Sequence, residues 1–231
     1  MSTSGGRGSR PGAITPRLVV DDVYDALVSL IVDGHVPPEG ALSIDALSRE
    51  LGVSTSPVRE ALTRLEGTGL IRRMALRGWR VAPALTREEL ADLVDARLLI
   101  EPGAAALAAG RADALLVRSL DESVSELGTA PKGARYESFR DYYEADRRFH
   151  RTIVAAGGNP FIEQAYEALG GQYQRFRLFT GTGVTDAAPT MAEHGAVRDA
   201  IAAGDADRAA EAMRAHLRGV RERALAELAD R

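Results

Sequence analysis

The spacing of hydrophobic residues near the start of the chain predicts helices. Over residues 17–33, apolar side chains recur three and four positions apart, which indicates an amphipathic helix that ends near Gly34. A shorter run of the same period predicts a second helix over 44–51, with Ser43 as its N-cap. Residues 1–16 show no such period, and we expect them to form a flexible tail.

The pattern then changes from helical to extended. The stretch 57–66 keeps the helical period, and Ser56, which a proline follows, is a suitable N-cap for a third helix. In 70–83, LIRRMALRGWRVAP, the two halves resemble short strands that meet at a tip near 76–78. Helices followed by a β-hairpin in this order are typical of a winged helix-turn-helix, which we expect over 17–83.

The second part of the chain has a helical pattern throughout, and no run alternates as strands do. The six expected helices cover residues 86–109, 112–127, 134–156, 159–180, 188–203 and 205–229. The sequence therefore predicts a mainly α protein. A winged helix-turn-helix of three helices plus a β-hairpin wing is followed, over 86–229, by an all-α bundle of six to seven helices.

Composition narrows the class of protein. Hydrophobic residues make up 45% of the 231 residues and charged residues 27%, as in ordinary globular proteins. No stretch reaches the roughly 18 uninterrupted apolar residues of a membrane span, and the N-terminus lacks the apolar segment of a secretory signal. The chain has no cysteine, so a metal ion would need His, Asp or Glu ligands. We expect a cytoplasmic protein with no membrane partner.

Charge is distributed unevenly along the chain. The net charge is −4, but residues 49–80 contain seven arginines and three glutamates, a local excess of four positive charges. A basic segment of this kind indicates nucleic-acid binding. Each arginine taken alone fits an ordinary solvated surface, whereas seven of them in a winged pattern favour double-stranded DNA as a partner.

The expected winged helix-turn-helix suggests which residues contact DNA. The second helix of its helix-turn-helix enters the major groove, and the wing lies along the backbone or the minor groove. An outward arginine can pair with a guanine edge or a phosphate, and free N–H groups at the helix start suit phosphate oxygens. Glycine at the wing tip allows close approach. The candidate residues are Ser54, Thr55, Ser56, Arg59, Arg77 and Gly78.

Residues 42–81 resemble the DNA-binding domain of the GntR family of bacterial regulators. The run GVSTSPVREALTRLEGTGLI carries the resemblance. In that family the arginine of PVRE, the residues at the helix start and the wing glycine contact operator DNA, which implies the same role for the candidate residues above. Many relatives have an arginine in place of Thr55, and some have a basic residue in place of Asp45, so we expect a different base preference.

Three of the four histidines lie on the hydrophobic faces of predicted helices. In YYEADRRFH, Asp146 and His150 are one turn apart within an apolar stripe, so their side chains converge. His194 and His216 lie on the apolar faces of two later helices, whereas His35 lies in a loop. A single inward histidine is more often a hydrogen-bonded core residue. Three of them with a buried aspartate, which needs a positive partner, predict a divalent metal site.

Residues 86–229 resemble the FCD effector domain of GntR regulators of the FadR type. The matching motifs are RxxxE from 97, DxxFH from 146, GNP from 158, EHxxVxxAIxxGD from 193 and MxxHL from 213. In metal-binding members the ligands are the aspartate and the three histidines of these motifs, which correspond here to Asp146, His150, His194 and His216. We expect zinc, and nickel, manganese or iron also suit such ligands.

The same resemblance implies further partners. It implies a homodimer, and an effector that is a small organic acid completing the coordination of the metal. Arg97 is the candidate contact to that acid, although its spacing from Glu101 fits a salt bridge equally well.

The function expected from these features is DNA-binding transcription regulation, as a repressor released from its operator by a small carboxylate. One alternative is a regulator whose metal is purely structural. Another is a metal-dependent hydrolase with a DNA-binding appendage, but the nearby acids Glu144 and Glu193 are expected to point to solvent, which leaves no general base. We therefore predict that the protein is not an enzyme.

Overall fold

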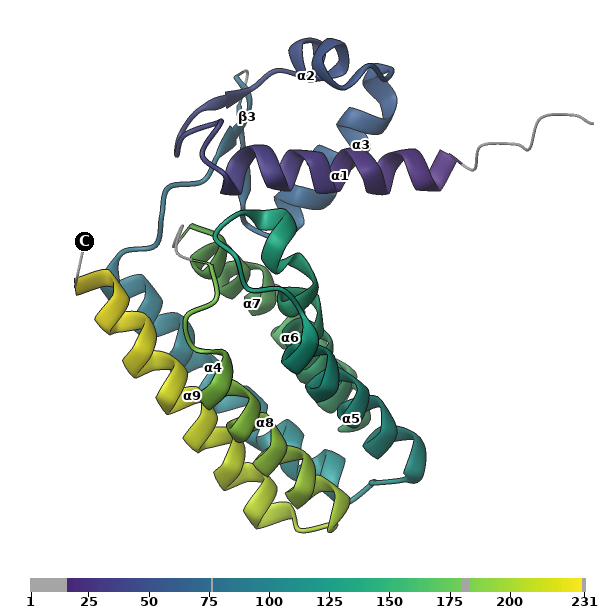
Figure 1. The fold of residues 1–231 in the computed structure, drawn as a ribbon, viewed down its shortest axis with the longest axis vertical. Helices are drawn as coiled ribbons and strands as arrows, with labels where there is room; N and C mark the ends of the chain where they lie inside the picture. Colours follow the sequence, from purple (N-terminus) through teal and green to yellow (C-terminus); the bar gives the residue numbers. More distant parts are fainter. Residues whose placement is uncertain (1–15, 76, 180–182, 230–231) are drawn as a thin grey trace, which may run out of the picture.

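The structure is a computed structural model, which describes residues 16–75, 77–179 and 183–229. Its N-terminal part, called the head below, contains three helices and a small sheet (Figure 1). The elements are α1 (Pro16–Val32), β1 (Ala41–Leu42), α2 (Ile44–Leu51), α3 (Thr55–Gly67), β2 (Ile71–Met74) and β3 (Gly78–Val81). The sheet is antiparallel in the order β1-β3-β2. Of the predicted tail 1–16, only Pro16 is described, and the predicted hairpin tip residue Leu76 also lies outside the described residues.

A bundle of helices follows the head. Its members are α4 (Arg87–Ala109), α5 (Ala114–Thr129), α6 (Tyr136–Ala156), α7 (Pro160–Phe179), α8 (Ala187–Ala202) and α9 (Ala206–Ala229). Each end lies within two residues of the predicted one. The predicted fold class, mainly α with a winged head and an all-α bundle, is confirmed. No helix in the described ranges combines the length and apolar character that crossing a bilayer requires.

The start of α3 differs from the prediction. Ser54, not Ser56, is the N-cap residue, with an extended backbone at φ −70° and ψ 165°, and Pro57 is the third residue of the helix. The prediction of Ser56 was wrong because the helix begins two residues earlier than the apolar period indicated. By contrast, Ser43 caps α2 as predicted, since its side chain accepts a hydrogen bond from the amide of Ala46.

Strand β1 was not predicted from the sequence. Two residues are too few to show an alternating pattern, so only the fold reveals that Leu42 pairs with Trp79 of β3. This third strand continues the wing sheet beyond the predicted hairpin. The indole Nε1 of Trp79 also donates a hydrogen bond to Glu66 Oε2 at 3.2 Å, which fixes the wing against the end of α3.

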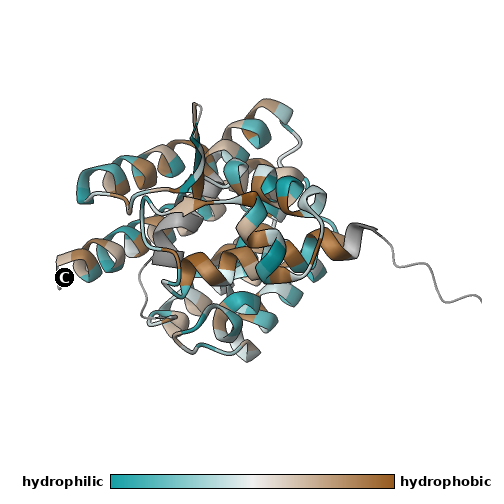
Figure 2. Ribbon diagram, turned by 90° about the horizontal axis from the view of Figure 1, so that it is seen from above, coloured by the Kyte–Doolittle hydropathy of each residue, from teal (hydrophilic) through white to brown (hydrophobic). Residues whose placement is uncertain are grey.

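The helices of the bundle pack lengthwise, with α9 beside α4 and α8, and α5 beside α6 (Figure 1). Seen from above, hydrophobic and hydrophilic segments alternate along the helices (Figure 2), as amphipathic packing requires. The head lies at one end, where α1 crosses over the bundle and α2 lies on the far side of α1 (Figure 1).

Helix α6 contributes to both parts of the molecule. Its predicted apolar stripe is buried along the whole helix. Phe139 and Tyr143, in its first half, belong to the hydrophobic cluster of the head. Phe149 and Ile153, in its second half, belong to the cluster at the centre of the bundle. One helix therefore connects the two cores.

Candidate metal centre and nucleic-acid interface

Three imidazoles meet inside the bundle, each from a different helix. His150 of α6, His194 of α8 and His216 of α9 are 2%, 0% and 1% exposed. The Nε2 atom of His216 lies 3.3 Å from Nε2 of His150 and 3.4 Å from Nε2 of His194. All three residues offer ligand atoms that lie within 4.8 Å of one another. The structure therefore brings together the three histidines that the sequence placed on separate inward faces.

Asp146 lies beside these imidazoles. Its Oδ1 atom is 3.6 Å from Nε2 of His194, and its side chain is 10% exposed. Within the described ranges, no arginine or lysine forms an ion pair with Asp146. A buried carboxylate of this kind is costly without a nearby positive charge, which a cation between it and the imidazoles would provide.

The spacing of the three imidazole nitrogens fits a single cation, whereas Asp146 lies outside the group whose ligand atoms are all within 4.8 Å of one another. Two nitrogens bound about 2.1 Å from one ion are about 3.0 to 3.4 Å apart at octahedral to tetrahedral angles. The separations of His216 Nε2 from the Nε2 atoms of His150 and His194, 3.3 and 3.4 Å, fall in that range. Three imidazole nitrogens and one carboxylate oxygen suit zinc and other first-row divalent ions. The donor set therefore fits the kind of ion predicted.

A carboxylate from α4 orients His150. Oε2 of Glu101 accepts a hydrogen bond from Nδ1 of His150 at 2.6 Å, and Oε1 of Glu101 accepts from Nε of Arg97 at 2.5 Å. Burial alone would raise the pKa of Glu101, but the charges of Arg97 and His150 and their hydrogen bonds outweigh it, so the pKa lies well below its usual value. With Nδ1 donating to this carboxylate, Nε2 of His150 presents its lone pair to the cluster.

A second carboxylate orients His216 in the same way. Oε2 of Glu193 lies 2.8 Å from Nδ1 of His216, and both oxygens of Glu193 accept hydrogen bonds from Arg223, at 2.8 and 2.9 Å. Burial lowers the pKa of His216 even though the bond to Glu193 opposes it. The prediction that Glu193 points to solvent was wrong: its side chain is 23% exposed and lies between the imidazole and the guanidinium.

The third imidazole is held by stacking. The ring of His194 lies parallel to that of Phe149, with centroids 4.0 Å apart and planes 6° apart. Phe149 directly precedes His150 on α6, so the same segment supplies one candidate ligand and the surface on which another rests. Packing and hydrogen bonds within the protein thus hold the three rings in position.

The sequence indicated the candidate ligands but not the roles of the two carboxylates that contact the Nδ1 atoms of His150 and His216. Glu101 was predicted only as a possible salt-bridge partner of Arg97, and Glu193 was expected to point to solvent. A glutamate next to an inward histidine, as at 193–194, and an arginine four residues before a glutamate, as at 97–101, were the available signals. The Arg97–Glu101 salt bridge, left open by the sequence, is present and buried. A contact between Arg97 and an effector stays a prediction.

In the head, the candidate DNA-binding residues lie on the outside. Ser54, Thr55 and Ser56 are exposed around the start of α3, and Arg59 is exposed one turn further on. The inward face of α3 is formed by buried residues, which are Val58, Ala61, Leu62 and Leu65. Arg77 and Gly78 are exposed at the wing, where Gly78 has a left-handed backbone with φ of +73° and open space around it.

The seven arginines of the basic segment divide into two groups. Four have partners within the head: Arg64 pairs with Asp21, Arg72 with Glu39, Arg80 with the carbonyl of Glu39, and Arg73 stacks on Trp79. Arg49, Arg59 and Arg77 are exposed and pair with no other residue of the described ranges. The arginine of PVRE and the wing arginine are therefore available to an external anion.

The structure joins a winged helix-turn-helix to an all-α domain, and the second helix of the helix-turn-helix carries an outward arginine. This combination defines a DNA-binding transcription regulator. Within that class, the chain belongs to the GntR family of bacterial regulators, in the FadR-type group that carries an FCD domain. Residues 19–81 match the family model described as "Bacterial regulatory proteins, gntR family", and residues 92–219 match the FCD domain. The resemblance noted in the sequence is confirmed, and the protein is a regulator, not an enzyme.

Similar proteins carry names that agree with this class. A probable D-xylose utilization operon transcriptional repressor of Paenarthrobacter nicotinovorans is 30% identical over 88% of this chain and 88% of its own length. The HTH-type transcriptional repressor GlaR of Escherichia coli is 29% identical over 85% of this chain and 91% of its own.

Two solved structures show the same fold. A GntR transcriptional regulator from Rhodococcus sp. RHA1 has a TM-score of 0.66 and 22% identity, and covers 92% of this chain and 99% of its own. The E. coli protein McbR/YncC has a TM-score of 0.68 and 19% identity, and covers 89% of this chain and 96% of its own.

Proposed function

We propose that this regulator is a repressor whose affinity for operator DNA is controlled by a small carboxylate bound at a metal ion in the bundle. The observation that carries the proposal is the convergence of three buried Nε2 atoms beside a buried aspartate. Asp146, His150, His194 and His216 would hold the ion, with zinc the expected metal. When bound, the ion supplies positive charge and open coordination positions for an oxygen ligand.

Charge balance supports an anionic effector. Of the three carboxylates next to imidazole nitrogens, Glu101 pairs with Arg97, and Glu193 shares Arg223 with Asp186. Asp146 pairs with no arginine or lysine of the described ranges, so it offsets one charge of a dication and leaves the second to a further ligand or to the shared carboxylates. A carboxylate would neutralise that charge, whereas a neutral ligand would not. Arg97, buried at 3% exposure, is our candidate for orienting the same carboxylate.

The DNA side of the proposal rests on the head. Arg59 would contact bases or phosphates in the major groove. The amides and hydroxyls of Ser54, Thr55 and Ser56 would contact phosphates, and Arg77 with Gly78 would contact the backbone beside the wing. The names of the Paenarthrobacter and GlaR relatives favour repression. A coupling free energy of about 1–3 kcal/mol would change operator affinity about 5–150-fold.

A homodimer is part of the proposal, because two heads read two half-sites. One surface of the bundle suits this role. Leu99, Gly103 and Leu107 are exposed at four-residue intervals on α4, and Leu99 is 86% exposed. Phe161, 80% exposed, is the second residue of α7, which packs against α4 through the cluster that includes Ile100 and Ile162. These four residues, called the α4–α7 face, would pack against the same residues of a second copy.

Protein purified without chelator provides the test. We expect a stoichiometric divalent ion by elemental mass spectrometry, lost in His216→Ala and kept in His35→Ala, which removes an imidazole from an exposed loop. A thermal-shift screen of small carboxylates on metal-loaded protein should find acids that raise Tm and also change DNA affinity.

Two results would separate this proposal from its alternative. Metal that raises Tm while no carboxylate alters DNA affinity would leave the ion a purely structural role. Metal content unchanged in His216→Ala would remove the proposed centre altogether.

A further inference from the structure

The start of α6 is capped by the head and not by its own neighbours in sequence. Arg135, the N-cap residue, makes no side-chain cap. Instead the amide of Tyr136 donates a hydrogen bond of 3.0 Å to Oδ1 of Asp33, a residue 103 positions earlier that directly follows α1. The other oxygen of Asp33 accepts a hydrogen bond from Ser29 Oγ at 2.9 Å, which fixes the carboxylate on α1.

A carboxylate is well suited to this position. The first amides of a helix have no partner within the helix, and the positive end of the helix dipole favours an acidic group there. The cap therefore stabilises α6 only while the end of α1 stays in place. Rotation or translation of the head relative to α6 breaks this hydrogen bond, so the cap is sensitive to the position of the head.

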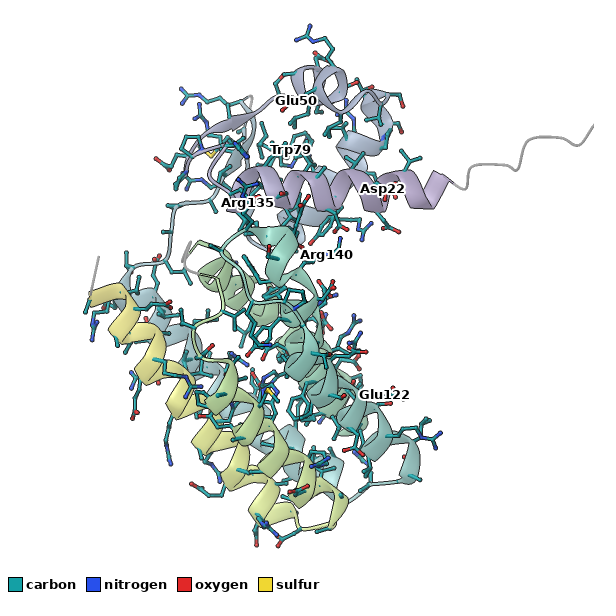
Figure 3. All side chains as sticks on the ribbon, in the orientation of Figure 1. Asp22, Glu50, Trp79, Glu122, Arg135 and Arg140 are labelled. Carbon is teal, nitrogen blue, oxygen red and sulfur yellow. The ribbon has the colours of Figure 1, made fainter. Side chains whose placement is uncertain are left out.

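Two further contacts join the same elements. Arg140 of α6 forms an ion pair of 2.9 Å with Asp25 of α1, at the junction seen in Figure 3. Tyr136, Phe139 and Tyr143 of α6 are buried in the hydrophobic cluster of the head. The first two turns of α6 are thus held by an amide cap, an ion pair and aromatic packing.

The same helix carries two members of the candidate metal centre. Asp146 lies one turn beyond Tyr143, and His150 lies one turn further. With a rise of 1.5 Å per residue, the capped amide of Tyr136 and Asp146 are about 15 Å apart along a continuous helix. A change in where Asp146 and His150 lie relative to α8 and α9 therefore moves the first turns of α6 as well, because packed helices shift as units.

We infer that Asp33 and Asp25 are positioning residues that couple the histidine centre to the DNA-binding head through α6. The inference rests on the proposed function, since it names the route by which the site reaches the DNA. It predicts that the contacts at the start of α6 can be weakened without loss of metal binding or of DNA binding, while the link between the two is lost.

The experiment uses the full chain, zinc as the probe and a DNA duplex that the wild-type protein selects from a random library. Operator affinity is measured by fluorescence anisotropy with zinc and after chelation, and zinc affinity by calorimetry. In the wild type the two DNA affinities should differ about 5–150-fold. In Asp33→Ala the ratio should fall to about twofold or less while zinc affinity stays within about threefold of the wild type.

Two matched variants accompany Asp33→Ala. Asp33→Asn keeps an oxygen that can cap the amide and should keep the zinc-dependent ratio. Asp22→Ala removes the same charge from an exposed position of α1 (Figure 3) and should also keep it. A direct readout is hydrogen exchange of the amides at 29–33, which should respond to zinc in the wild type and in Asp33→Asn but not in Asp33→Ala.

The ion pair gives an independent arm if Asp33→Ala folds poorly. Asp25→Arg and Arg140→Asp should each reduce the zinc-dependent ratio, and the double variant, which restores the pair with the charges exchanged, should recover it. A full ratio in both Asp33→Ala and the single charge variants would overturn the inference. If neither zinc nor a carboxylate changed the DNA affinity of the wild-type protein, the proposed function would be contradicted. The inference, which rests on it, would then be wrong as well.

Discussion

Arg59 and Arg64 lie five residues apart on α3 and have the same formal charge, yet they have different partners. Arg64 pairs with Asp21 at 2.5 Å and lies 4.8 Å from the ring centre of Tyr24. Arg59 is exposed and pairs with no other described residue. The basic segment is therefore not a uniform surface, and the arginines expected to bind DNA, Arg59 and Arg77, are among those that pair with no other described residue.

Replacement of Arg59 by alanine should weaken binding to the selected duplex by about 1–3 kcal/mol, because one bidentate base contact or a phosphate contact is lost. Tm should not change, since the guanidinium pairs with no other residue of the described ranges. Arg118→Ala, which removes an exposed arginine of α5, is the control and should leave DNA affinity unaltered. Equal effects of the two changes on anisotropy titrations would refute the assignment.

Glu193 shows that a residue next to a histidine in sequence can act on another histidine in space. It precedes His194, but its carboxylate contacts His216 and Arg223. Glu193→Ala should lower metal affinity about 10–100-fold, because the ring of His216 loses the acceptor that orients it. Glu222→Ala removes an exposed carboxylate from α9 and should have no effect on calorimetric zinc titrations. Unchanged zinc binding in Glu193→Ala would count against an orienting role.

At the scale of elements, the local signals for helix ends were mostly sufficient. Ser43 caps α2, and Gly52 ends it with a left-handed backbone at φ +67°. The start of α3 was predicted two residues late, because Pro57 fits the third position of a helix as well as the first. The short strand β1 was missed because pairing with β3, and not its own sequence, defines it.

Gly52 makes a prediction about the turn between α2 and α3. A Cβ atom added there would meet nothing within 4 Å, so only the backbone conformation opposes a side chain. Gly52→Ala should therefore lower the free energy of unfolding by about 1 kcal/mol, because the left-handed region disfavours other residues. Gly52→Asn should cost less, since asparagine tolerates this region. Calorimetric melting of both variants checks the order, and an alanine variant as stable as the wild type would contradict it.

The whole molecule joins two cores through α6. Tyr136, Phe139 and Tyr143 in its first half are buried against the head, and Phe149 in its second half is buried in the bundle. The candidate metal centre also depends on the whole bundle, because α4, α6, α8 and α9 all contribute side chains to it. No single segment contains the site, so its geometry depends on how these helices pack together.

The proposed dimer is tested at the same scale. Leu99→Glu and Phe161→Glu should convert a dimer into monomers in analytical ultracentrifugation, because each places a charge in the centre of an apolar contact. Leu115→Glu is the matched control, since Leu115 is 66% exposed on α5 and lies outside the α4–α7 face. The control should sediment as the wild type does. If Leu115→Glu alone dissociated the dimer, the interface would lie elsewhere and not on the α4–α7 face.

The amino-acid sequence by itself determined the positions of the helices, the inward faces that carry Asp146, His150, His194 and His216, and the family to which the chain belongs. Hydrophobic period and caps act within a few residues, so these features can be read along the chain. Only the tertiary structure decided which arginines have partners, that Glu101 and Glu193 orient the imidazoles, and that Asp33 caps α6. The contacts of Glu101, Glu193 and Asp33 join residues 23 to 103 positions apart, and they depend on distances in space that no local pattern encodes.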